Sequence, residues 1–108
     1  MILSAEDLLA GTDTSFEIAI PDSVFQPNGL QNGQMPSVKV KPLSIGVFQL
    51  IIKGAKEDAG LIPVLMIKEG MAEPKLTVQQ IKALPVGLVE FLVEQIRNVS
   101  GLSEKKTT

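Results

Sequence analysis

Two stretches in the first half of the chain alternate between apolar and polar side chains, as half-buried β-strands do. In residues 15–20 a phenylalanine or an isoleucine stands at every second position, and in residues 37–41 two valines alternate with lysines. Successive side chains of a strand point to opposite faces, so each run has one apolar face. We therefore expect an antiparallel pair of strands in which Glu17 lies near Lys39 and Lys41.

After the second strand the pattern takes the period of a helix. Residues 44–56 gather valine, phenylalanine and isoleucine along one side, with Ser44 as the candidate N-cap. A shorter pattern over residues 61–69 predicts a second helix, which we expect Gly70 to end. A further short helix is expected before the strands, at residues 4–10, where a serine and an aspartate stand at capping-box spacing.

The strongest helical pattern comes last. Thr77 and Gln80 have the spacing of a capping box that opens a short helix over residues 78–84. A long helix over residues 85–99 follows, with Gly101 as its stop signal. The apolar side chains of this helix cover an arc of roughly 160°, against about 100° for the stripe of an ordinary surface helix.

Together these elements predict an α+β fold: an N-terminal antiparallel β-ribbon followed by a small helical group of three to four helices. We expect a single domain over residues 1–102. Residues 21–36 contain three prolines and two Asn-Gly pairs, which predict a long loop that is mobile in the free protein. Residues 103–108 are polar and predict a flexible tail.

The composition favours binding over catalysis. The 108 residues include no His, Cys, Trp or Tyr, and the net charge is −2. Acid–base catalysis near neutral pH most often uses His, and soft metal sites need Cys or His. No long-range positive field would attract nucleic acid, and no stretch approaches the ~18 apolar residues of a membrane span. We therefore predict a non-enzymatic protein with no cofactor, no metal, no nucleic acid partner and no membrane contact.

A pair of glutamates and three methionines can each be interpreted as part of a functional site or as ordinary structural residues. Glu90 and Glu94 stand one helical turn apart, as the paired carboxylates of a glycosidase or a metal site could, but a solvated helix face is the favoured interpretation. Met35, Met66 and Met71 could mark an adaptable binding surface, because methionine repacks easily, or they could fill the core and a loop.

The wide apolar sides of the two longest helices are the best candidate for a binding surface. The ribbon and the shorter helices could cover them completely within one domain. Otherwise part of the surface is left for another chain, and the sequence leaves both possibilities open. The candidate partner-binding residues are Val47, Phe48, Ile51, Ile52, Leu88, Val89, Leu92, Val93 and Ile96.

Three segments between residues 37 and 102 form a pattern that is known from other proteins. They are the strand VKVKPLS, which leads into an apolar helix, then KED at a helix end, and EPKLTVQQIKALPVGLVEFLVEQIRNVSGL. In these segments the chain resembles the small tail assembly chaperones of long-tailed bacteriophages.

The resemblance implies a phage tail assembly chaperone in the cytoplasm of the infected bacterial host. Such a protein binds the tape measure protein and keeps it soluble during tail assembly. The tail tube protein and further copies of the chain, in a homo-oligomer, are the other partners that we expect.

Two other classes of function remain open. One is a small structural tail or baseplate subunit that is retained in the virion and joins a ring through the ribbon edge and the long loop. The other is a small bacterial adaptor unrelated to phage. Gene order separates them, because a chaperone gene should lie directly between a major tail protein gene and a very long tape measure gene.

The charged tail yields a test in the coding DNA. The resemblance implies a longer form made by a ribosomal frameshift, which needs a slippery heptamer close to the end of the short reading frame. Glu104-Lys105-Lys106 can be encoded GAA-AAA-AAG. These codons contain A-AAA-AAG, on which both tRNAs can re-pair one base upstream. Sequencing the gene checks this prediction. If the codons interrupt the adenine run, or if no open reading frame continues in the −1 frame, these residues are an ordinary charged tail.

Overall fold

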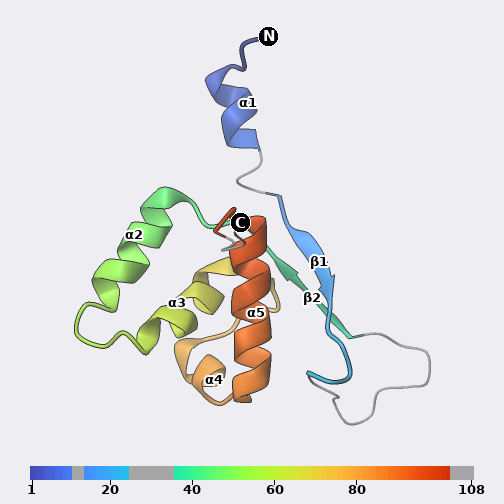
Figure 1. Cartoon of the computed structure of the whole chain (residues 1–108), viewed down its shortest axis with the longest axis vertical. Coiled ribbons are helices and arrows are strands. Elements are labelled where there is room, and N and C mark those ends of the chain that lie inside the picture. Colours follow the sequence, from blue (N-terminus) through green and yellow to red (C-terminus); the bar gives the residue numbers. More distant parts are fainter. Residues whose placement is uncertain (11–13, 25–35, 103–108) are drawn as a thin grey trace, which may run out of the picture.

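The computed structural model describes residues 1–10, 14–24 and 36–102 of the chain, and within them it contains five helices and three strands. The predicted α+β class is therefore confirmed (Figure 1). Most of the predicted loop at 21–36, and the whole tail at 103–108, lie outside the described residues, so their mobility stays a prediction. In chain order the elements are α1 (Ala5–Leu9), β1 (Phe16–Ala19), β2 (Ser37–Val40), α2 (Ile45–Gly54), α3 (Leu61–Gly70), β3 (Met71–Glu73), α4 (Val78–Lys82) and α5 (Val86–Val99).

The two alternating segments pair as the sequence predicts. β1 and β2 are antiparallel, and Glu17 stands directly opposite Lys39. The Glu17 carboxylate also accepts a hydrogen bond of 2.9 Å from the Ser37 hydroxyl. On the opposite face of the ribbon Val40 is fully buried, and Ile20, just beyond β1, is buried with it. One face of the ribbon is thus solvated and the other rests on the core.

The third strand was not predicted, and here the sequence analysis was wrong. Gly70 does not stop α3 from outside the helix; it is the last residue of α3, and the chain continues directly into β3. β3 pairs antiparallel with β2, so that the ribbon becomes a three-stranded sheet in the order β1-β2-β3. The Lys39 ammonium lies 3.7 Å from the Glu73 carboxylate across this pair. A strand of three residues is too short to show a period-2 pattern, which is why it escaped detection.

The predicted helix starts are confirmed. The hydroxyls of Ser4, Ser44 and Thr77 each accept a hydrogen bond, of 3.1, 3.2 and 3.2 Å, from the backbone N–H three residues further on. These bonds satisfy N–H groups that have no partner within the helix. Hydroxyl side chains at these positions therefore define where α1, α2 and α4 begin.

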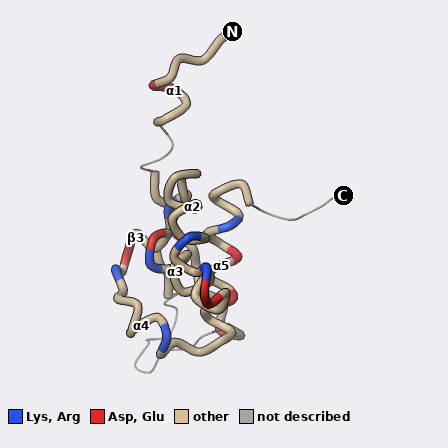
Figure 2. Tube along the Cα trace, turned by 90° about the vertical axis from the view of Figure 1, so that its left-hand side faces the viewer, with Lys and Arg blue, Asp and Glu red and all other residues tan. Residues whose placement is uncertain are grey.

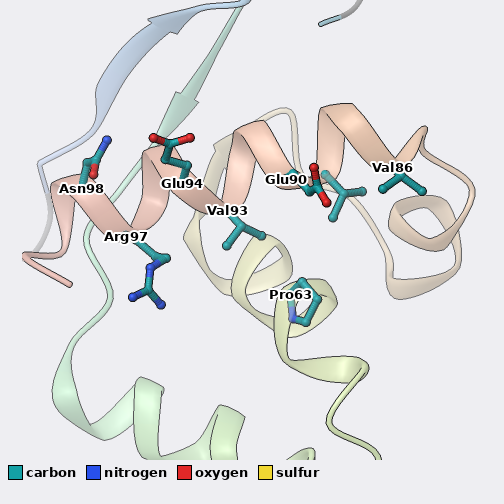
Figure 3. A pocket seen from close by; sticks show the side chains of 8 residues that line it. Pro63, Val86, Glu90, Val93, Glu94, Arg97 and Asn98 are labelled. Carbon is teal, nitrogen blue, oxygen red and sulfur yellow. The ribbon is translucent and has the colours of Figure 1, made fainter. Parts of the chain in front are cut away.

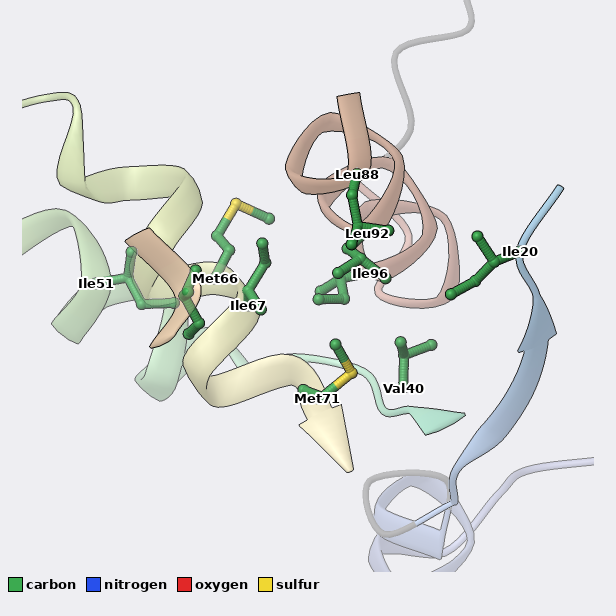
Figure 4. Close-up of a cluster of buried hydrophobic side chains, with 10 residues drawn as sticks. Ile20, Val40, Ile51, Met66, Ile67, Met71, Leu88, Leu92 and Ile96 are labelled. Atoms are coloured by element: carbon green, nitrogen blue, oxygen red, sulfur yellow. The ribbon is translucent and has the colours of Figure 1, made fainter. Parts of the chain in front are cut away.

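The core forms where α3 and α5 pack together and against the sheet (Figure 4). Side chains from α5, α3, β2 and β3 converge there, and no residue of α1 takes part. The buried apolar cluster consists of Ile20, Val40, Ile51, Met66, Ile67, Met71, Ile81, Leu88, Leu92 and Ile96.

Gly70 brings three elements to one point. A Cβ atom at this position would lie 2.7 Å from Cγ2 of Ile96, closer than packed carbon atoms can approach. The Gly70 carbonyl also accepts a hydrogen bond of 2.8 Å from the backbone N–H of Lys41, at the end of β2. The absent side chain thus lets α5 settle directly on the junction between α3 and β3.

The end of α5 is fixed twice. Gly101 has a φ of 76°, and the N–H groups of Gly101 and Leu102 donate to the carbonyls of Asn98 and Arg97, at 3.2 and 2.8 Å. This arrangement is a Schellman motif, and it confirms Gly101 as the stop. In addition, the Ser100 hydroxyl accepts a hydrogen bond of 2.8 Å from the N–H of Leu43, 57 residues earlier in the chain. The end of α5 is therefore tied to the connection between β2 and α2.

The first helix stands apart from the rest of the described chain. Figures 1 and 2, which view the molecule from two perpendicular directions, both show α1 at one end of the long axis, leading away from the other elements. No residue of α1 is buried. The packed part of the described chain therefore begins at β1.

The close approach at Gly70 predicts opposite effects for two glycine substitutions. Gly70→Ala should destabilise the protein by about 1–3 kcal/mol, because the added methyl group overpacks the site against Ile96. Gly87→Ala, in the first turn of α5, adds a methyl group that meets nothing within 4 Å. It should be neutral or stabilising by up to about 1 kcal/mol, as alanine is the better helix former. Urea unfolding midpoints test both variants. Equal midpoints would show that the core yields freely at Gly70.

Candidate functional site

The structure divides the nine predicted partner-binding residues into two groups. Ile51, Leu88, Leu92 and Ile96 are each at most 5% exposed and belong to the protein's own core. Their surfaces are already covered by the chain itself, so they are not available to a partner in this fold. The remaining five are half-buried or exposed: Val47, Phe48, Ile52, Val89 and Val93.

The wide apolar arc of α5 is divided between the core and the protein surface. Its centre, formed by Leu88, Leu92 and Ile96, faces the core. One flank, formed by Val86, Val89 and Val93, remains partly open to solvent, and Val86 is 72% exposed. The two possibilities that the sequence left open, complete burial or a surface left free, are thus each realised on part of the helix.

This flank borders an open hollow of about 640 Å³ on the side of α5 that faces α3 (Figure 3). Figure 3 shows Val93 pointing from α5 toward Pro63, in the first turn of α3. We call this hollow the α5 groove. Its apolar lining is Pro63, Val86, Val89 and Val93, and its polar lining is Glu90, Glu94, Arg97 and Asn98.

A second apolar strip lies on α2. The charged residue of this strip is basic, whereas the α5 groove contains the carboxylates of Glu90 and Glu94. Ile51 faces the core, whereas Ile45 and Ile52, seven residues apart and therefore on one side of the helix, are 72% and 45% exposed. Lys53, in the last turn of α2, follows Ile52 in the sequence. We call Ile45, Ile52 and Lys53 the α2 strip. Apart from Lys56, no other residue from Ser44 to Lys56 carries a charge.

Little in the described residues favours catalysis. Within residues 1–10, 14–24 and 36–102 no polar or charged side chain is buried, and no three His, Cys, Asp or Glu side chains are grouped to hold a metal ion. Glu90 and Glu94 are both exposed, as a solvated face requires. The absence of enzymatic activity stays a prediction.

Two further points concern the sequence hypotheses. Met66 and Met71 are buried in the core, so the binding-surface interpretation is wrong for both; Met35 lies outside the described residues. Every helix in the described part of the chain is too short or too polar to span a membrane.

Sequence reasoning missed three apolar residues of these surfaces, as well as the charged and polar residues beside them. Val86 belongs to the predicted arc of α5 and Ile45 to the edge of the predicted α2 pattern, and helical periodicity could have placed both on the open flanks. Pro63 could not be found in this way. Its position beside α5 depends on how α3 packs, which no local pattern contains.

Comparisons of the chain with protein-family models, with curated proteins and with solved structures found no match. The resemblance to tail assembly chaperones therefore depends on its three sequence segments alone.

Substitutions at three consecutive residues of α5 should lower stability in proportion to how deeply each side of the helix is buried. Leu92→Asp should cost at least about 3 kcal/mol, because it removes core packing and buries an unpaired carboxylate. Val93→Ser, on the half-buried flank, should cost about 1 kcal/mol of apolar burial. Glu94→Ala, on the exposed side, should stay within about ±0.5 kcal/mol. Guanidinium unfolding midpoints give the order. If Glu94→Ala were the most damaging of the three, this assignment of helix faces would be wrong.

Proposed function

We propose that the protein is a non-enzymatic binding protein whose α5 groove holds an amphipathic helix of a partner protein. The observation that carries this proposal is the open flank of α5, where Val86, Val89 and Val93 line the groove, although Val89 and Val93 also pack against the edge of the core. These side chains belong to a helix that is packed along its centre and capped at its end. A partner would therefore meet a rigid surface, and binding would cost little ordering of the groove.

The spacing of the apolar side chains suits a helical partner. Val86, Val89 and Val93 follow one side of α5 for about two turns, or roughly 10 Å. A helix that presents apolar side chains at positions i, i+3 or i+4, and i+7 matches a strip of this length. Pro63 of α3 adds an apolar side chain across the groove.

The charges around the groove favour one class of partner. Glu90 and Glu94 stand beside the apolar strip, and Arg97 lies nearer the C-terminal end of α5. A partner helix with Lys or Arg next to its apolar stripe would be complementary to the two carboxylates. Arg97 already donates a hydrogen bond of 2.8 Å to the Leu102 carbonyl, so the complementarity depends on the two carboxylates. Such a pattern sets the orientation of binding more than its strength.

The resemblance supplies the identity of the partner. We propose that it is the tape measure protein of a long-tailed phage, and that the chain acts as a tail assembly chaperone in the cytoplasm of the host. A long helical protein that awaits assembly exposes apolar stripes, and large exposed apolar surfaces promote aggregation. A groove that covers one such stripe would keep the protein soluble until the tail tube forms around it.

The β1 edge favours a second candidate, a structural tail or baseplate subunit. Among the residues that the structure describes, β1 pairs with β2 on one side and with no strand on the other, and Phe16 at its start is 41% exposed. An open strand edge can accept a strand from a neighbouring subunit. The two functions differ in whether the protein is retained in the finished virion, and mass spectrometry of purified virions decides between them. A subunit would be present in stoichiometric amounts, and a chaperone would not.

Groove variants test the first proposal. Overlapping fragments of the tape measure protein, labelled with a fluorophore, would be titrated with the full chain. The combined substitution Val89→Ser and Val93→Ser should weaken binding at least about tenfold, through lost apolar contact. Glu90→Lys with Glu94→Lys should weaken the binding of basic fragments and reverse its salt dependence, because attraction becomes repulsion.

The control changes the α2 strip, with Ile45→Ser and Ile52→Ser, and should leave fragment affinity unchanged. Circular dichroism would confirm that each variant is folded. The proposal fails if no fragment binds, or if the groove variants bind every fragment as the wild type does.

A further inference from the structure

The segment Met1–Ala10, which we call the α1 arm, exposes more apolar surface than a solvated helix normally does. Ile2 is 96% exposed and Leu8 is 68% exposed, and Met1, Leu3 and Leu9 are exposed as well. In the described residues α1 makes no extensive contact with any other helix or strand. Exposed apolar surface that is concentrated on one short segment marks a site of interaction.

The arm is nevertheless preorganised. The Ser4 hydroxyl accepts from the N–H of Asp7 at 3.1 Å, and the Asp7 carboxylate accepts from the N–H of Ser4 at 3.0 Å, which completes a capping box. Leu3 and Leu8 occupy the two positions of a hydrophobic staple. A helix of five residues has little stability in water on its own. Local capping that holds such a helix together suits a segment that docks as a helix onto another surface.

The charges of the chain select the surface that fits the arm. Glu6 and Asp7 are the only charged side chains of the arm. The α2 strip combines two exposed isoleucines with Lys53, and so offers apolar contact together with the opposite charge. The α5 groove has two carboxylates, Glu90 and Glu94, and one guanidinium, that of Arg97, so it would oppose the acidic arm with a net negative charge. Like charges across an interface are unfavourable, so the arm fits the α2 strip and not the α5 groove.

The position of the arm favours a second copy of the chain over its own α2. Leu9, at the base of the arm, already borders a hollow with Pro42, Leu43 and Val47, beside the start of its own α2. From there the arm leads away from the packed elements, as both views show (Figures 1 and 2). Ile2 and Leu8 therefore remain uncovered by their own chain. We propose that the α1 arm of one copy docks on the α2 strip of a second copy, so that chains associate by exchanging arms.

Two pairs of substitutions, combined in one experiment, test the arm exchange. The arm variant carries Ile2→Ser and Leu8→Ser, and the strip variant carries Ile45→Ser and Ile52→Ser. All four positions are exposed, so both variants should fold like the wild type. The matched control is Leu50→Ser, which alters an equally exposed leucine of α2 that borders a different hollow, with Val47 and Leu65. Light scattering after size exclusion, over a series of concentrations, reports the mass of each full-length protein.

We expect the wild type and the control to associate with rising concentration, and added salt to weaken this association. Each variant alone should require at least about tenfold more protein to associate. An equimolar mixture of the two variants should form a heterodimer, because the intact arm of the strip variant meets the intact strip of the arm variant. Own-chain docking predicts that this mixture stays monomeric.

Three results would overturn the proposal: a wild type that is monomeric at every concentration, an arm variant that associates like the wild type, or a mixture that forms no heterodimer. The inference goes beyond the proposed function and is tested without any tape measure fragment. The groove variant Val89→Ser with Val93→Ser should associate like the wild type, so that failure of either proposal leaves the other intact.

Discussion

The contact between Gly70 and Ile96 is the constraint on which the rest of the structure depends. With no side chain at Gly70, α5 lies against the point where α3 passes into β3, and the core side chains of both helices meet there. The same glycine accepts the hydrogen bond from Lys41 that aligns the end of β2. One position without a Cβ thus sets the distance between the helices and the place where the sheet joins them. The open flank of α5 follows from it, since the helix is held with its centre, and not its whole arc, against the core.

Local features of the sequence predicted most of the fold. The hydroxyl caps at Ser4, Ser44 and Thr77 and the stop at Gly101 act within a few residues, so the sequence contains all that is needed to recognise them. β3 was missed because three residues show no period. The candidate site was only half predictable for a related reason. Periodicity identifies the apolar arc of a helix, but which part of the arc is covered depends on where Pro63, Met71 and Val40 lie in space.

α2 and α5 share one design. Each buries the centre of its apolar arc and leaves one flank open, and the flanks differ in the charge beside them: carboxylates on α5, a lysine on α2. Apolar surface alone would accept any apolar partner. A charge at its border adds discrimination, because a mismatched partner must leave its own charge unpaired or repelled. The two exposed apolar surfaces of this small chain, the α5 groove and the α2 strip, can therefore bind different partners.

The hydrogen bond between Leu43 and Ser100 has a consequence for how the chain acquires its structure during synthesis. It joins residues 57 positions apart, and the helix that ends beside Ser100 supplies the buried Leu88, Leu92 and Ile96. Until that helix has left the ribosome, Ile67, Met71 and Val40 lack the part of the buried cluster that Leu88, Leu92 and Ile96 supply, and the β1–β2 pair alone is only marginally stable in water. The interior formed by residues 14–24 and 36–102 therefore stays incompletely covered until α5 is added, and these residues complete their packing only then.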